Sequence, residues 1–325
     1  MVRKVQCLLC PKKCILGEGQ RSDCRVRLNL GGDLKTLIYG KVCAANVDPI
    51  EKKPLYHFQP STWAFSIATA GCNLHCKFCQ NWAISQQEPE KTRNLDLYPA
   101  KVVNLAMERN CASIAYTYSE PVIFFEYMID TCRLAHQKGV RNVWVTAGFI
   151  NQEPLRELCR ELDGANIDLK SINEWYYREV CNAELKPVLE TIVMARKNGV
   201  WVELTNLVVP TLNDTEDDFK RLSRWIKENA GTEVPLHFSR FWPMYKLQNL
   251  PPTRVEKLNQ AREIAMAEGL KYVYIGNVPG NPGSNTYCPE CRKVVIKRVG
   301  YQTDASNLEK GNCRFCGQPI RGIWG

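Results

Sequence analysis

The sequence predicts an α/β protein built on a parallel sheet, with a small cysteine-rich module at each end of the chain. Short apolar runs alternate with helical stretches from residue 63 to residue 275, and polar or glycine-bearing residues directly follow most of the apolar runs. Repeated strand–helix units of this kind form a parallel sheet with right-handed crossovers, which is either open or closed into a (β/α) TIM-like barrel. The modules are indicated by the 16 cysteines, most of which cluster at the spacing of metal ligands.

The length and composition are those of a globular protein. A chain of 325 residues can bury a large core, and its net charge of +9 comes from basic residues that are dispersed, which indicates a solvated surface. Residues 1–30 lack the apolar segment of a signal peptide, and no stretch approaches the ~20 apolar residues of a membrane span. We therefore expect a cytoplasmic protein whose cysteines are not paired in disulfides.

Three domains are predicted. Residues 1–60 form a cysteine-rich module with an extended connector, residues 61–277 form the α/β domain, and residues 278–325 form a second cysteine-rich module. The predicted strands of the α/β domain cover residues 63–70, 112–118, 141–146, 166–169, 200–209, 234–238 and 271–275. Its predicted helices cover 97–109, 120–138, 154–162, part of 175–198, a stretch capped by Asp214, and 253–268.

A loop with three cysteines follows the first predicted strand of the α/β domain. Cys72, Cys76 and Cys79 have the spacing C-x3-C-x2-C. Thiolates suit a soft metal centre, and four of them would close a zinc site or saturate an iron–sulfur cluster. Three thiolates leave one metal position open for chemistry. The five scattered cysteines are interpreted mostly as small buried apolar residues: Cys43, Cys111, Cys132, Cys159 and Cys181.

Each terminal module carries four cysteines. The N-terminal set has the spacing C-x2-C-x3-C-x9-C in a short segment that cannot build a core of its own, so a metal would supply the cross-link: Cys7, Cys10, Cys14 and Cys24. Zinc is the first interpretation here, and a second iron–sulfur cluster is the alternative. The C-terminal set forms two C-x2-C knuckles typical of a zinc ribbon, or of a mononuclear iron site of rubredoxin type: Cys288, Cys291, Cys313 and Cys316.

The three-cysteine loop resembles the signature of the radical S-adenosylmethionine (SAM) superfamily. The string from Cys72 to Trp82, with Phe78 before the last cysteine, is most similar to the pyruvate formate-lyase activating enzymes. Together with both terminal modules, residues 48–58 and residues 116–121, it resembles the AmmeMemoRadiSam-system radical SAM protein over essentially the whole chain.

This resemblance implies a radical SAM barrel, partial or full, and a reaction. Cys72, Cys76 and Cys79 would hold a [4Fe–4S] cluster, and SAM would bind its fourth iron. Reductive cleavage of SAM would give a 5′-deoxyadenosyl radical, which abstracts a hydrogen atom from an unidentified small-molecule or protein substrate. The implied partners are an electron donor such as flavodoxin or ferredoxin and proteins of the AMMECR and Memo types, and zinc is expected in both terminal modules.

The resemblance also assigns residues to SAM. Glu120 would accept the SAM amino group, although an acidic residue at a helix N-terminus has a structural explanation as well. Tyr118 and Ser119 precede it where the family usually has two glycines, which departs from the pattern. Thr146 and Gly148 resemble a Thr-Asn-Gly turn in which alanine replaces the asparagine.

Four residues at later strand ends complete the predicted SAM site. Asp168 and Lys170 match an Asp-Leu-Lys strand end and would contact the ribose or the carboxylate of SAM. His237 would border the adenosyl or substrate region, with a structural role as the alternative. Asn277 would touch adenine, unless it is simply the residue of a turn.

Two other functions remain open from the sequence. A glycyl-radical activating enzyme is favoured by the cysteine loop but would not need the two terminal modules. A non-catalytic zinc or nucleic-acid-binding module is compatible with the positive charge. However, no stripe of alternating aromatic and basic residues occurs in the C-terminal module, so nucleic acid is not expected, and the three-cysteine loop would go unexplained.

Overall fold

The computed structural model describes residues 4–324, and its centre is an eight-stranded sheet. The strand order is β14-β13-β12-β11-β10-β9-β7-β6, in which β6 is antiparallel to β7 and the others are parallel. The strands are β6 (Ala44–Pro49), β7 (Trp63–Ala68), β9 (Ser113–Tyr116), β10 (Arg141–Thr146), β11 (Gly164–Asp168), β12 (Trp201–Val208), β13 (Leu236–Arg240) and β14 (Val273–Gly276). Within residues 4–324, β14 and β6 do not pair, so the sheet is open and the full barrel does not form.

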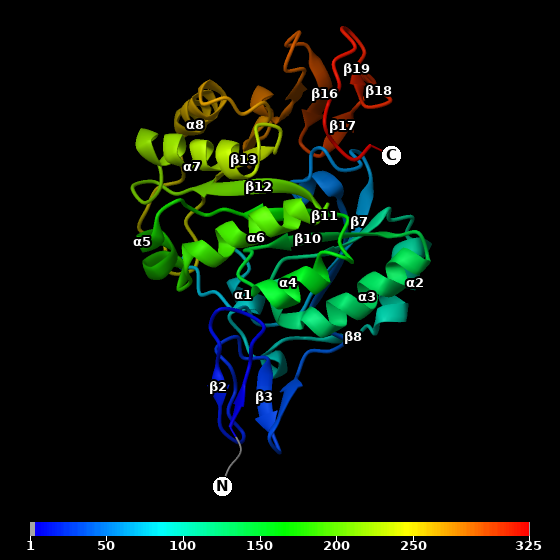
Figure 1. The fold of residues 1–325 in the computed structure, drawn as a ribbon, viewed down its shortest axis with the longest axis vertical. Helices are drawn as coiled ribbons and strands as arrows, with labels where there is room; N and C mark the ends of the chain where they lie inside the picture. The colour runs from blue at the N-terminus through cyan, green and yellow to red at the C-terminus, as the bar shows by residue number, and fades with distance from the viewer. Residues whose placement is uncertain (1–3, 325) are drawn as a thin grey trace.

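Helices follow most of the strands and lie along one side of the sheet (Figure 1). They are α2 (Pro99–Glu108), α3 (Phe125–Gln137), α4 (Gln152–Leu158), α6 (Leu185–Lys197), α7 (Glu216–Asn229) and α8 (Val255–Ala267). Each presents an apolar stripe to the sheet; in α7 the stripe consists of Phe219, Leu222 and Ile226, spaced three and four residues apart. Shorter turns are α1 (Trp82–Ser85), α5 (Glu174–Tyr176), η1 (Ile50–Lys52), η2 (Pro89–Lys91), η3 (Pro121–Phe124), η4 (Tyr177–Cys181) and η5 (Pro282–Ser284).

The alternation predicted from the sequence is confirmed, with differences at the ends of elements. Asp214 is not the cap of α7: Thr215 accepts a hydrogen bond from the amide of Asp218, and the Asp218 carboxylate accepts one from the amide of Thr215. This capping box satisfies two amides that the helix itself leaves free. Part of the predicted connector is ordered as strand β6, which pairs with β7 along its whole length.

A segment before β7 closes the end of the sheet where the parallel strands begin. The backbone amides of Tyr56 and His57 donate to the buried carboxylate of Glu203, at 3.0 and 2.7 Å. Phe58 packs so closely on Gly164 that a Cβ there would lie 2.9 Å from its ring. This segment leaves the opposite end of the sheet, where the parallel strands finish, as the place for a site.

The two cysteine-rich modules lie at opposite ends of the molecule (Figure 1). The N-terminal module contains β1 (Val5–Gln6), β2 (Ile15–Leu16), β3 (Arg27–Leu30) and β4 (Asp33–Thr36), and is followed by β5 (Lys41–Val42), which pairs with β8 (Leu95–Asp96). The C-terminal module contains β15 (Thr286–Tyr287), β16 (Val294–Val299), β17 (Gln302–Asp304), β18 (Leu308–Glu309) and β19 (Asn312–Cys313). Across residues 4–324, every helix is too short or too polar to cross a membrane.

Candidate functional site

The carboxyl ends of the parallel strands surround one large cavity, where sites in parallel sheets are expected. Its volume is about 530 Å³. Eight of the predicted site residues line it: Cys72, Cys76, Cys79, Glu120, Thr146, Asp168, Lys170 and Asn277. The structure therefore brings together residues that are separated by up to about 200 positions in the sequence.

The three-cysteine loop forms one wall of this cavity, directly after β7. All three cysteines are free of disulfides. The amide of Leu74 donates to the Cys72 sulfur at 3.3 Å, and the Cys79 sulfur lies 3.2 Å from the Ser85 hydroxyl. Burial raises the pKa of Cys72 and of Cys79, so these thiols stay protonated at neutral pH unless a metal displaces their protons.

Cys181 is a neighbour of the loop that the sequence did not reveal. Its thiol hydrogen-bonds Cys76, which lowers the pKa of Cys76, and the nearby Lys170 charge acts in the same direction. The backbone amide of His75 also donates to the carbonyl of Cys181, at 2.9 Å. Cys181 lies about 100 residues beyond the loop and outside any cysteine motif, so the spacing of cysteines carried no signal for it.

Glu120 is a buried carboxylate that faces the cysteine loop. Its oxygens accept hydrogen bonds from the Thr146 hydroxyl at 2.5 Å and from the amides of Ala147 and Val122 at 2.7 and 3.2 Å. Burial raises the pKa of Glu120 to about 7, although these three donors favour its charged form. A carboxylate has about four acceptor positions, so it can still accept a bond from a cationic ligand group.

The turn before Glu120 takes the conformation for which glycine is usually needed. Tyr118 has φ 64°, in the left-handed region that non-glycine residues rarely adopt. The hydroxyl oxygen of Ser119 is buried, lines the cavity and has no hydrogen-bond partner within residues 4–324. An unpaired buried oxygen beside Glu120 fits a site that a polar ligand completes.

Asp168 and Lys170 form an ion pair in the cavity wall, with Nζ 2.7 Å from the Asp168 carboxylate. Burial would lower the pKa of Lys170, but Asp168 and the thiols of Cys76 and Cys181 outweigh it, and the pKa is raised well above its ordinary value. The ammonium group lies 5.8 Å from the centre of the Phe78 ring, beside the cysteine loop. It therefore supplies positive charge beside the thiols of Cys76 and Cys181.

Two predicted residues lie outside the lining of the cavity. His237 is buried and its Nε2 lies 2.7 Å from Glu203, in the layer that closes the far end of the sheet. Gly148 supports Glu120 indirectly. Its amide donates to the Thr146 hydroxyl at 2.9 Å, and that hydroxyl donates to the Glu120 carboxylate. Asn277 does reach the cavity and donates to the Ser239 hydroxyl at 2.8 Å.

Residues from outside the predicted set also line the cavity. Lys53 is buried and its ammonium group lies 2.7 Å from Asp48, which also accepts from the Tyr118 hydroxyl. Burial lowers the pKa of Lys53 to about 8. Lys52 and Tyr301, the latter from the C-terminal module, line the same cavity. These positions come from two different modules, so no local sequence pattern connects them.

The C-terminal cysteines converge on one point. The sulfurs of Cys288 and Cys316 lie 3.6 Å apart, and those of Cys291 and Cys313 lie 3.7 Å apart. Four thiolates bonded to one zinc at about 2.3 Å stand about 3.8 Å from one another. The quartet is therefore arranged for a single tetrahedral ion.

Comparisons with known proteins agree with this geometry. The model of the radical SAM superfamily matches residues 66–226. The chain is 48% identical to an uncharacterized protein of Methanocaldococcus jannaschii, over 98% of this chain and 95% of that protein. It is 21% identical to the pyruvate formate-lyase-activating enzyme of Clostridium pasteurianum, over 58% of this chain and 83% of that enzyme.

A solved structure shares the fold. SuiB of Streptococcus suis, bound to the precursor peptide SuiA, superposes with a TM-score of 0.52 at 11% identity, over 71% of this chain and 52% of SuiB. The region that the radical SAM model matches, residues 66–226, contains the cysteine loop, Glu120 and the Asp168–Lys170 pair. These residues lie around one cavity. The chain therefore belongs to the radical SAM superfamily, and membership implies an enzyme that uses a [4Fe–4S] cluster and SAM.

Proposed function

We propose that this protein is a radical SAM enzyme whose cluster is held by Cys72, Cys76 and Cys79 and whose SAM is held by Glu120, Thr146, Asp168 and Lys170. The observation that carries this proposal is the shared cavity: three free thiols and a buried carboxylate with an elevated pKa line the same space. When bound, the cluster and SAM together supply a 5′-deoxyadenosyl radical that can remove a hydrogen atom from a substrate.

The protein residues have distinct tasks in this scheme. Glu120 accepts the SAM amino group, a charge-assisted bond that also replaces the solvation lost on burial. Thr146 and the amide of Ala147 hold the Glu120 carboxylate in place. Lys170, oriented by Asp168, attracts the SAM carboxylate. Ser119 offers the unpaired hydroxyl described above as a further polar contact.

The cavity has the size of a small-molecule site. Its volume of about 530 Å³ lies within the ~300–1000 Å³ of such pockets. Its lining also includes residues that are not part of the SAM site: Lys52 and Lys53 from the connector and Tyr301 from the C-terminal module. These residues are the place where the identity of the substrate is selected.

A second candidate is the activation of a glycyl-radical enzyme, where the hydrogen atom comes from a protein glycine. The similarity to a pyruvate formate-lyase-activating enzyme favours it. The two candidates separate in one experiment: a glycyl radical signal appears in a partner protein only if the partner is the substrate. The AMMECR-type and Memo-type proteins, and a flavodoxin or ferredoxin as electron donor, are partners to test in the same way.

The proposal is tested by SAM cleavage after anaerobic reconstitution with iron and sulfide. Wild type is expected to form 5′-deoxyadenosine only when a reductant is present, and Cys76→Ala is expected to lose at least a hundredfold because one cluster ligand is gone. Cys111→Ala is the matched control, since Cys111 is also buried but lies outside the cavity. A wild type that takes up no iron and never cleaves SAM contradicts the proposal.

A further inference from the structure

We propose that the N-terminal quartet Cys7, Cys10, Cys14 and Cys24 holds a second four-iron cluster rather than a single zinc ion. The two terminal quartets have similar composition but different geometry. Across residues 4–324, the C-terminal quartet is the one set of three or more possible ligands that gathers its ligand atoms within 4.8 Å of one another. The N-terminal quartet does not meet this distance, and neither does the loop of Cys72, Cys76 and Cys79.

The separation of the sulfurs distinguishes a single ion from a cluster. One zinc bonded to four thiolates at about 2.3 Å draws them to within about 3.8 Å of one another. A four-iron cluster places a cube of iron and sulfide between its thiolates, which keeps them farther apart. The three-cysteine loop has this wider arrangement, and its superfamily implies a [4Fe–4S] cluster there. The N-terminal quartet shares that arrangement with it.

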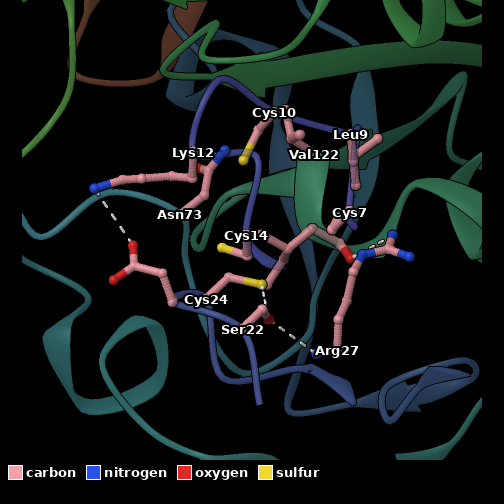
Figure 2. A pocket seen from close by; sticks show the side chains of 12 residues that line it. Cys7, Leu9, Cys10, Lys12, Cys14, Ser22, Cys24, Arg27, Asn73 and Val122 are labelled. Carbon is pink, nitrogen blue, oxygen red and sulfur yellow. Dashed lines mark hydrogen bonds and ion pairs between the residues drawn. The ribbon is translucent and has the colours of Figure 1, made fainter. Parts of the chain in front are cut away.

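The N-terminal cysteines line one shared cavity, although their sulfurs do not gather within 4.8 Å of one another. All four of them contribute to its lining. Figure 2 shows Cys10, Cys14 and Cys24 disposed around it. Apolar side chains seal its inner side, where a thiolate cluster is protected from water: Leu9, Val122 and Ile123.

A polar group of the cysteine loop also reaches this space. Asn73, which follows Cys72 directly, lines the cavity and hydrogen-bonds the Cys10 thiol. Its side-chain nitrogen also donates to the Phe149 carbonyl at 2.8 Å, which holds the amide in place. An amide N–H that donates to a thiol lowers the thiol's pKa and favours the thiolate that a metal needs, so Asn73 is suited to neighbour a thiolate-bound metal centre.

The second cluster would lie next to the loop of Cys72, Cys76 and Cys79. A Cβ on Gly71, the residue before Cys72, would stand 2.6 Å from the Cys24 carbonyl oxygen. Asn73 lines the cavity of the N-terminal quartet, while its neighbours Cys72 and Leu74 line the cavity of the cysteine loop, so one short backbone segment separates the two cavities. The N-terminal module is therefore built into the wall of the SAM site.

Metal content tests this inference independently of SAM chemistry. After anaerobic reconstitution, wild type is expected to hold about eight irons per chain, as two four-iron clusters require. A variant with Cys72→Ala, Cys76→Ala and Cys79→Ala is expected to keep half of that iron and to show the reduced-cluster signal in electron paramagnetic resonance. A Cys10→Ser, Cys14→Ser variant is expected to lose the other half.

The outcomes separate this inference from the proposed function. If wild type holds about four irons and two zincs, and the triple variant holds no iron, the N-terminal site is zinc and only this inference fails. If wild type takes up no iron at all, both fail. If the triple variant does not fold, the iron and zinc content of wild type alone distinguishes one cluster from two.

Discussion

At the scale of single residues, Glu120 is the group whose chemistry depends most on its surroundings. Burial raises its pKa to about 7, while three hydrogen-bond donors hold the carboxylate in one orientation. A carboxylate that is half protonated near neutral pH is costly to keep charged, and a cationic ligand group offsets that cost. The binding of SAM should therefore follow the ionisation of Glu120.

SAM affinity is expected to rise with pH around this pKa. The charged fraction of Glu120 grows from about one tenth at pH 6 to about nine tenths at pH 8, which should tighten the apparent Kd about tenfold. Titration calorimetry on wild type and Glu120→Gln measures this, and the affinity gap between them should widen as pH rises.

The control for this titration is Glu108→Gln, on the exposed end of α2, which should keep the wild-type profile. If the difference in SAM affinity between wild type and Glu120→Gln stays constant from pH 6 to pH 8, Glu120 does not bind a cation. SAM affinity is expected to rise with pH because the cationic ligand group binds only the deprotonated Glu120 carboxylate.

At the scale of elements, the junction between β7 and the N-terminal module decides whether the cysteine loop is correctly placed. Gly71 has φ 92°, and a side chain there would collide with the Cys24 carbonyl and with Val26, both at 2.6 Å. Only glycine combines this backbone conformation with so close an approach.

Gly71→Ala should therefore lower the free energy of unfolding by about 3 kcal/mol, from left-handed strain together with the collision. Gly139→Ala is the matched control: it has φ 72° but nothing within 4 Å of the new Cβ, so about 1 kcal/mol is expected. Denaturant unfolding compares the two, and iron uptake should fall only in Gly71→Ala. Equal losses would contradict the close packing of module and loop.

Much of the element pattern could be predicted because the strands alternate with amphipathic helices. The parts that the sequence did not predict depend on distant contacts. Strand β6 comes from a proline-rich stretch and forms only because β7 offers it an edge. Thr215, rather than Asp214, caps α7 because Asp218 returns the hydrogen bond. The sequence predicts His237 at a strand end, but β13 runs from Leu236 to Arg240, so His237 lies at the start of the strand, where it contacts Glu203 and not the cavity.

At the scale of the whole molecule, three cysteine sets lie on one scaffold and differ in the space between their sulfurs. The spacing of cysteines in the sequence located all three sets, but it does not determine the distances between their sulfurs. The sulfurs of the C-terminal quartet are as close as the four ligands of one zinc ion, and the same module contributes Tyr301 to the lining of the cavity. The module is joined to the segment before β7 through Arg298, which donates to the Tyr56 carbonyl at 2.8 Å.

Removing two C-terminal ligands should release metal without disturbing the iron sites. A Cys291→Ser, Cys316→Ser variant is expected to lose about one zinc per chain and to keep its iron, because half of a four-thiolate site is gone. Plasma mass spectrometry of wild type, this variant and a Cys111→Ser control checks it. Loss of one iron instead of zinc would assign a mononuclear iron site to this module.

The central claim is that Cys72, Cys76 and Cys79 leave one metal position free for SAM. Electron paramagnetic resonance of the reduced protein, with and without SAM, tests it most directly. The account predicts that SAM shifts the part of the spectrum that Cys76→Ala removes and leaves the rest in place. A wild-type spectrum that contains this component but does not change at saturating SAM would contradict the claim.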